Sequence, residues 1–166
     1  MEANNTINDV PCKSGVDLEG AIGRVDHRLD SKRRVIIPLR WHDQMGSPKN
    51  VYVMENLMGE TCLDVYTEED FNKRIRSFMD GPMSDTDRAE FVRDLAESCE
   101  VIPVDAQQRI RIPDDMLAYA GLETEIVLLR TGRHLEVWSL ANRPKKRAGN
   151  EERRERMANR LRKYGV

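Results

Sequence analysis

The chain has 166 residues and a formal net charge of −2; 34% of its residues are charged and 5% are aromatic. This length suits one ordinary domain or two small ones, and the absence of an apolar run of roughly 18 residues excludes a membrane-spanning helix. The cysteines are odd in number and far apart, and the histidines lack ligand-like spacing, so we expect reduced thiols in a cytoplasm, no metal site and no cofactor. These residues are Cys12, Cys62, Cys99, His27, His42 and His134.

The net charge hides an asymmetry between the end of the chain and the rest. Residues 143–166 contain ten Lys and Arg against three Glu, a local charge of +7, whereas the rest holds 17 basic and 26 acidic residues, a charge of −9. Local charge attracts a polyanion more than the total does. At the other end, residues 1–20 lack the basic and apolar regions of a signal peptide and are expected to form a flexible leader.

The first folded unit is expected over residues 21–66. It begins with core positions that alternate with polar residues, as in a half-buried strand: Val25, His27 and Leu29. A polar turn over residues 30–34 then leads into a second strand, and the two strands form a hairpin-like element. Pro38 suits the start of a short helix and Gly46 its end. Two further strands follow, Val51–Met54 and Leu63–Tyr66.

Residues 67–98 are expected to form two linking helices. Thr67 and Ser84 are suitable N-cap residues, and the Gly81-Pro82 pair separates the helices. Apolar residues at helical spacing predict a buried stripe on each helix. The residues of these stripes are Phe71, Ile75, Phe78 and Met79, then Phe91, Val92, Leu95 and Ala96.

A seventeen-residue segment of the first unit recurs 75 positions later, where DSKRRVIIPLRWHDQMG aligns without a gap with DAQQRIRIPDDMLAYAG. The second unit, residues 99–138, is therefore expected to repeat the order strand, turn, strand, short helix, strand, strand. Because a single copy is too small for a stable core, we expect the two copies to share one. The predicted fold class is α+β, with a mainly β core and peripheral helices.

Residues 139–166 are expected to form a basic C-terminal helical tail. Ser139 is a suitable N-cap, and a helix is expected to resume near Glu151 with a thin apolar seam. The seam consists of Met157, Leu161 and Tyr164. Two interpretations of the tail stay open. Its Lys and Arg side chains could add nonspecific affinity for DNA, or it is an ordinary solvated helix, which the i, i+4 pair of Glu152 and Arg156 favours.

The D-x-x-x-R turn that leads into an apolar strand and a proline resembles the AbrB-type, or SpoVT-AbrB, swapped-hairpin DNA-binding domain. Two such copies with a helical pair between them resemble the MraZ family of bacterial transcriptional regulators, from Ala21 to Trp138. The resemblance implies that the two repeats interleave their hairpins into one pseudo-dimeric barrel. It also implies a homo-oligomeric ring, associated with the nucleoid in the cytoplasm. By the same resemblance, the ring is expected to bind repeated elements in double-stranded promoter DNA and to repress the division and cell-wall gene cluster.

Each turn carries side chains suited to contact with DNA. Asp30 and Asp105 are interpreted as turn organisers whose carboxylates bond to backbone N–H groups. The expected DNA-binding residues are Lys32, Arg33, Arg34, Gln107, Gln108 and Arg109. Arginine can bridge guanine, glutamine can read adenine, and basic residues at the tip of a turn suit phosphates. The alternative is that each Asp–Arg pair is only a structural ion pair repeated with the fold.

One departure from the family pattern lies at the tips of the turns. The family turn usually reads D-x-K-G-R, whereas Arg33 and Gln108 stand here in place of the glycine. A left-handed conformation is less favourable for a residue with a Cβ than for glycine. Either the turn differs slightly from the family's, or the side chain adds a contact.

Two other functions compete with that of a regulator. AbrB-type folds also serve as antitoxins that act through a protein partner, but such proteins usually carry one copy and a disordered tail. An enzyme is the least favoured, because the sequence has no nucleophile–base arrangement, phosphate loop or metal-ligand spacing, and no small-molecule substrate is evident. We therefore expect a non-enzymatic, sequence-specific DNA-binding regulator.

Overall fold

The computed structural model describes residues 22–143 and 150–165. The expected leader over residues 1–20 lies outside the described residues, as do residues 144–149 of the expected tail. None of the described helices is long and apolar enough to cross a membrane. The chain folds into a mainly antiparallel β structure with five described helices, so the α+β class is confirmed.

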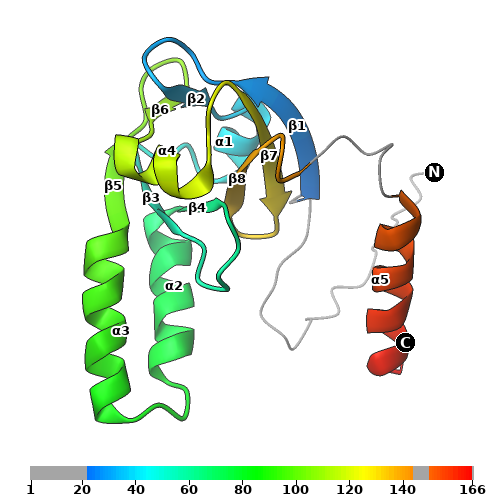
Figure 1. The fold of residues 1–166 in the computed structure, drawn as a ribbon. Helices are drawn as coiled ribbons and strands as arrows, with labels where there is room; N and C mark the ends of the chain where they lie inside the picture. Colours follow the sequence, from blue (N-terminus) through cyan, green and yellow to red (C-terminus); the bar gives the residue numbers. More distant parts are fainter. Residues whose placement is uncertain (1–21, 144–149, 166) are drawn as a thin grey trace, which may run out of the picture.

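The elements follow the expected order along the chain (Figure 1). The first copy of the repeat forms β1 (Ile22–Arg28), β2 (Arg34–Ile36), α1 (Leu39–Gln44), β3 (Asn50–Glu55) and β4 (Leu63–Tyr66). Two longer helices follow, α2 (Glu68–Met79) and α3 (Asp85–Ser98). The second copy forms β5 (Cys99–Pro103), β6 (Arg109–Arg111), α4 (Asp114–Ala120), β7 (Glu125–Thr131) and β8 (Leu135–Ser139). The last described element is α5 (Asn150–Lys163).

Six strands form one antiparallel sheet in the order β1-β7-β8-β4-β3-β5. The equivalent strands β1 and β5 each pair with the other copy of the repeat, β1 with β7 and β5 with β3. β4 and β8, which are also equivalent, pair with each other in the middle of the sheet. The sheet is therefore symmetric about the β4–β8 pair, and each copy of the repeat supplies a strand to the other half.

The expected closed barrel is not formed by the described strands. β1 and β5 are the two edges of the large sheet, and β2 pairs with β6 in a separate two-stranded sheet, here called the β2–β6 ribbon. The turns after β1 and β5 carry the chain out of the large sheet, so the strands that follow them pair with each other instead of closing it. The prediction of a barrel is therefore wrong in its closure.

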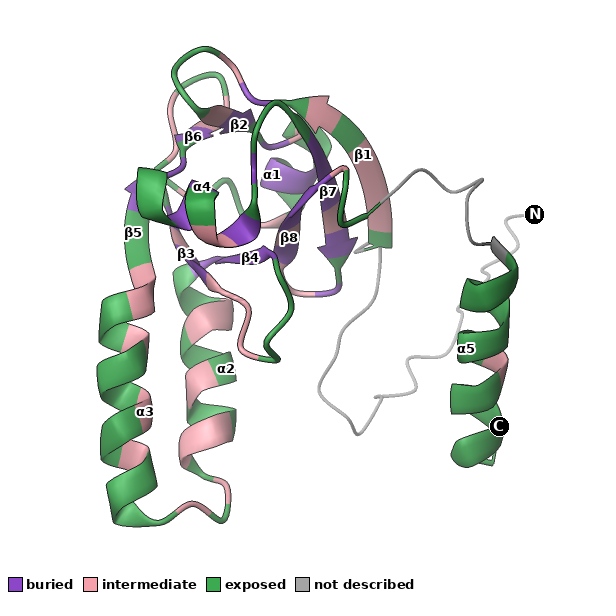
Figure 2. Cartoon of the chain, viewed as in Figure 1, coloured by how far each residue is buried: buried purple, intermediate pink, exposed green. Residues whose placement is uncertain are grey.

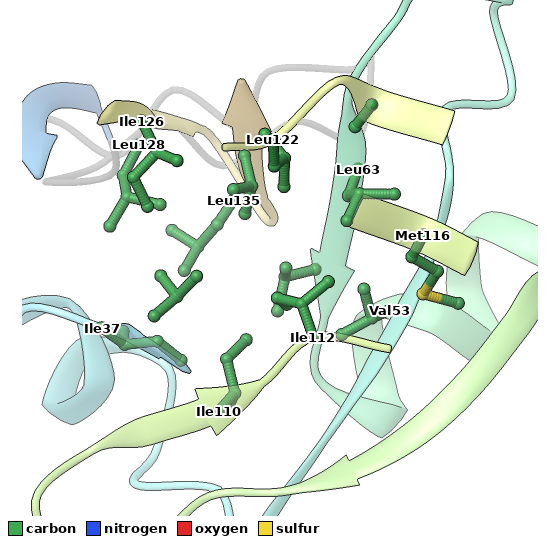
Figure 3. Close-up of a cluster of buried hydrophobic side chains, with 14 of the residues drawn as sticks. Ile37, Val53, Leu63, Ile110, Ile112, Met116, Leu122, Ile126, Leu128 and Leu135 are labelled. Carbon is green, nitrogen blue, oxygen red and sulfur yellow. The ribbon is translucent and has the colours of Figure 1, made fainter. Parts of the chain in front are cut away.

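The main hydrophobic core lies between the large sheet, the β2–β6 ribbon and the helices α1 and α4. Val35 and Ile110 enter it from the ribbon and are each 1% exposed. Figure 3 shows Ile37, Ile110 and Ile112 facing the side chains of Ile126, Leu128 and Leu135 across this cluster. Burial of one such aliphatic side chain stabilises the fold by about 1.5–3 kcal/mol, so the ribbon is held to the sheet mainly by its inner face.

Proline and glycine bound the two short helices as expected. Pro38 and Pro113 precede α1 and α4, where the missing N–H of proline costs nothing. Gly46 has φ +84° after α1, and Gly121 has φ +62° at the end of α4, both in the left-handed region that glycine adopts freely. The ends of these helices therefore follow from local sequence alone.

Side-chain caps begin the two longer helices. The hydroxyl of Thr67 accepts a hydrogen bond from the backbone N–H of Asp70, and that of Ser84 accepts one from Asp87, which confirms both predicted N-caps. Ser139 differs from this prediction. Its hydroxyl accepts from the backbone N–H of Asn142, but residues 140–142 form a turn and not a helix.

The helices α2 and α3 run side by side away from the sheet (Figure 1) and contain no fully buried residue (Figure 2). The stripe residues that we expected to be buried are half-buried or, for Val92 and Ala96, exposed. Aromatic rings instead contact each other where the elements meet. Tyr52 stacks on Phe71, with 4.6 Å between ring centroids, and Phe78 packs at a tilt against Phe91 at 5.5 Å. Because no third layer of described residues covers α2 and α3, each of these helices buries only one narrow side.

Candidate nucleic-acid interface

Each D-x-x-x-R turn is closed by its aspartate. Oδ1 of Asp30 accepts hydrogen bonds from the backbone N–H groups of Lys32 and Arg34, at 2.8 and 3.0 Å. Its Oδ2 accepts from Nε of Arg34 at 2.6 Å. Asp105 makes the same three contacts in the second turn, with the backbone of Gln107 and Arg109 and with Nε of Arg109, at 2.9, 2.9 and 2.7 Å. Each carboxylate thus holds the turn and one edge of a guanidinium together.

These contacts make the stability of the turns depend on pH in the acid range. The backbone N–H of Arg34, and then its side chain, hold the pKa of the Asp30 carboxyl below its ordinary value, and Arg109 acts likewise on Asp105. A carboxyl with a lowered pKa in the folded state adds stability above its unfolded pKa, about 3.9 for Asp. That stability is lost as the pH falls through the lower, folded pKa.

We therefore expect these two aspartates to contribute to the free energy of unfolding at neutral pH and to lose that contribution in acid. Urea unfolding of the wild-type chain between pH 2.5 and 6 should show a fall in stability below about pH 4. The double variant Asp30→Asn, Asp105→Asn should show a smaller fall over the same range. If the free energy of unfolding fell equally with pH in the two proteins, protonation of these two aspartates would not affect stability.

The residues in place of the family glycine adopt the left-handed conformation. Arg33 has φ 60° and Gln108 has φ 59°. Each side chain also makes a contact: Nη1 of Arg33 lies 3.4 Å from the carbonyl oxygen of Glu123, and Nε2 of Gln108 donates to the carbonyl of Ala106 at 3.0 Å. The second alternative is therefore confirmed, since each side chain adds a contact while its residue adopts the left-handed conformation.

Glycine at these positions is expected to stabilise the fold. A left-handed conformation destabilises the folded state by about 1–2 kcal/mol when the residue has a Cβ. Glycine avoids this strain, but its greater freedom in the unfolded chain offsets about 0.5–1 kcal/mol of the gain. Arg33→Gly and Gln108→Gly should each raise the free energy of unfolding by about 0.5–1 kcal/mol in urea titrations. Lys32→Gly is the matched control, because Lys32 is not left-handed, and should lower it by a similar amount. A loss of stability in the first two variants would contradict this assignment of strain.

The outer face of the β2–β6 ribbon carries three arginines. Arg34 lies opposite Arg111, and Ile36 lies opposite Arg109. Directly opposed residues and residues two apart share one face of an antiparallel pair, so these four side chains point away from the core. Arg111 is exposed, Arg34 and Arg109 are half-buried, and Ile36 is 40% exposed. The two turns extend this face from opposite ends of the ribbon, because β2 and β6 are antiparallel.

The structure places the predicted site residues in two groups. Lys32, Arg33 and Gln107 are exposed at the tips of the turns, and Gln108 is half-buried in the second turn. Arg34 and Arg109 are on the ribbon, where each is ion-paired through Nε, with 24% and 28% of the side chain exposed. Gln107 accepts from Nη2 of Arg109 at 3.1 Å. For Arg34, the recorded side-chain contact among the described residues is made by Nε, and no hydrogen-bond partner of its Nη atoms is recorded there.

Sequence reasoning missed Arg111 as a member of this surface. The signal was present, since Arg109 and Arg111 alternate with Ile110, which predicts that both arginines leave the core on the same side. The predicted DNA-binding arginines come from the turn motif alone, and the strand that follows the second turn is predicted only as a structural element. The register with Arg34 could not be read from the sequence.

The fold and this surface define a class of internally duplicated α+β proteins that expose a basic two-stranded ribbon. The chain is 27% identical over 145 residues, 87% of its length and 99% of the relative's, to the transcriptional regulator MraZ of Alkaliphilus oremlandii. It is 30% identical over 118 residues to that of Clostridium botulinum and over 116 residues to that of Acetivibrio thermocellus, covering 80% and 78% of those proteins. No family model matches the chain. The chain belongs to the MraZ family of transcriptional regulators.

Proposed function

We propose that this protein is a sequence-specific transcriptional regulator that binds double-stranded promoter DNA through the β2–β6 ribbon and its two turns. The observation that carries the proposal is the shared outward face of Arg34, Arg109 and Arg111. The names of the relatives support a regulator and not an enzyme.

The shape and chemistry of the ribbon suit the major groove of DNA. The groove admits a two-stranded β-ribbon, and a guanidinium can bridge O6 and N7 of guanine. The Asp30 contact fixes Arg34 through Nε and leaves the Nη edge for a base. Lys32 and Arg33 at the first tip suit phosphates, and Gln107 and Gln108 at the second suit adenine. The first turn should therefore supply more of the electrostatic affinity than the second.

The strand pairing supports the swapped-hairpin arrangement that the resemblance implies. β1 and β5 each complete the half of the sheet formed by the other copy. We accordingly propose the SpoVT-AbrB boundaries of residues 21–66 and 99–138, joined by linking helices over residues 67–98. One ribbon offers few phosphate contacts, whereas linked ribbons gain from effective concentration. The assembly we propose is a homo-oligomeric ring, located in the cytoplasm and on the nucleoid. This ring binds repeated elements and represses the division and cell-wall gene cluster.

Binding of the purified chain to the DNA upstream of its own gene tests this function. Fluorescence anisotropy across 50–200 mM salt, beside unrelated DNA of equal length, should show selective binding that weakens steeply with salt. Equal affinity for both DNAs would contradict sequence-specific regulation. No binding at low salt would contradict the whole proposal and favour an antitoxin-like role through a protein partner.

A further inference from the structure

A second polar cluster lies on the face of the large sheet opposite the main core, where β4 and β8 run side by side (Figure 1). Asp64 is opposite Glu136 in the register of these strands, and His134 directly precedes β8. One ligand atom from each of the three residues lies within 4.8 Å of the other two. The cluster joins the two copies of the repeat, because Asp64 comes from the first and the other two residues come from the second.

The separations suit a shared ion better than direct hydrogen bonds. Nε2 of His134 is 3.7 Å from Oδ1 of Asp64 and 3.6 Å from Oε1 of Glu136. Hydrogen bonds between nitrogen and oxygen are about 2.7–3.2 Å long. Ligand atoms that each lie about 2.0–2.2 Å from one zinc ion are about 3.0–4.3 Å apart, depending on the angle at the metal. The two distances fall inside this range.

The negative charge of the cluster also favours a bound cation. The Asp64 side chain is 3% exposed and that of Glu136 is 17% exposed. Among the described residues, His134 is the cationic group recorded within 4.0 Å of these carboxylates. A buried carboxylate is costly unless it is paired or bound to a metal. With a neutral imidazole the cluster carries two negative charges, which one divalent ion would neutralise.

Groups outside the cluster hold the carboxylates in a ligand-like orientation. Nδ2 of Asn56 donates to both oxygens of Asp64, at 3.1 and 3.2 Å. Nε1 of Trp138 donates to Oε2 of Glu136 at 2.8 Å, which leaves Oε1 toward His134. Metal-binding carboxylates are typically fixed by such outer hydrogen bonds. The ring of Tyr66 stacks on that of His134 at 4.8 Å and fixes its plane.

We propose that Asp64, His134 and Glu136 bind one divalent first-row transition metal ion, for which Zn²⁺ is the probe. The imidazole nitrogen favours such an ion over Mg²⁺ or Ca²⁺, which prefer all-oxygen sites. The ion bridges β4 to the β7–β8 hairpin and so stabilises the junction between the two copies of the repeat. Without the ion, Nε2 of His134 forms a hydrogen bond of 3.2 Å with the hydroxyl of Thr131, which the ion would replace. The sequence alone does not indicate this site, because positions 64 and 134 are far apart in the chain and only the sheet brings them together.

Equilibrium dialysis of the EDTA-treated full chain against micromolar Zn²⁺, with the metal quantified by mass spectrometry, tests the site. We expect one zinc ion per chain in the wild type. His134→Gln should bind at least about 100-fold more weakly, since loss of an outer-shell group alone costs 10–100-fold. His27→Gln is the matched control and should retain the ion, because His27 is on β1 and its Nδ1 accepts from the backbone of Arg28. Equal zinc binding by wild type and His134→Gln, or none by the wild type, would overturn the proposal.

Thermal unfolding supplies a readout that does not depend on DNA. At a hundredfold excess of Zn²⁺ over its Kd, the melting temperature of the wild-type chain should rise by about 5–10 °C, and Mg²⁺ at that concentration should leave it unchanged. Glu136→Gln provides a second variant in case His134→Gln fails to fold, and it should lose most of the shift. A shift of equal size with Mg²⁺, or in Glu136→Gln, would contradict a transition-metal site at these residues.

Discussion

Replacing Arg34 with alanine is expected to weaken selective DNA binding by about 1–3 kcal/mol, or roughly 10- to 100-fold in Kd. The reason is that its side chain lies on the outer face of the ribbon while Asp30 holds its Nε edge, so we expect the guanidinium to be already oriented for a base. This result rests on the proposed DNA-binding function. Fluorescence anisotropy with the cognate DNA and an unrelated DNA measures it, and the loss should be larger for the cognate site.

Three further variants separate base contact from general charge. Arg109→Ala should cost less than Arg34→Ala, because the second turn carries glutamines in place of Lys32 and Arg33. Arg111→Ala should weaken binding to all sequences alike and reduce the salt slope by about 1, as expected for a phosphate contact. Arg40→Ala, an exposed arginine on α1 outside the ribbon, is the control and should change little. Equal losses in all four variants would show that charge alone, and not the ribbon face, governs binding.

Truncating Ile110 is expected to have the largest effect on stability, a loss of about 2–5 kcal/mol in the free energy of unfolding for Ile110→Ala. Ile110 is 1% exposed and packs from the ribbon into the core shared by both copies of the repeat. A cavity there removes contacts with the sheet that hold the ribbon in place. Denaturation in urea, followed by far-UV circular dichroism, measures the change.

Ile36→Ala is the matched control for this prediction. Ile36 is the same residue type in the same ribbon but lies on the outer face, with 40% exposure. Its truncation should change stability by no more than about 0.5 kcal/mol, as is usual for surface positions. Similar losses from the two variants would contradict the division of the ribbon into a buried inner face and a free outer face.

Local signals account for most of what could be predicted from the sequence. Pro38 and Gly46 bound a short helix because of their own backbone preferences, and Thr67 caps α2 through its own hydroxyl. The aligned copies repeat these signals, so the order of strands and helices was predicted twice from independent residues. Each of these predictions depends on positions within a few residues of one another.

Long-range pairing accounts for what could not be predicted. The pairing of β1 with β7 in the open sheet, and of β2 with β6 in the ribbon, depends on contacts between copies of the repeat that no local pattern encodes. Arg111 joins the candidate interface only because that register places it opposite Arg34. The half-burial of Phe71 and Phe78 likewise depends on how few elements cover α2, which helical periodicity does not show.

Hydrogen–deuterium exchange of the full chain, with and without DNA from upstream of its own gene, tests the central claim most directly. The account predicts that DNA slows amide exchange at residues 30–36 and 105–111, the two turns and the ribbon, and leaves α3 unchanged. Protection confined to α5, or to α2 and α3, would contradict the assignment of the ribbon as the DNA-binding surface.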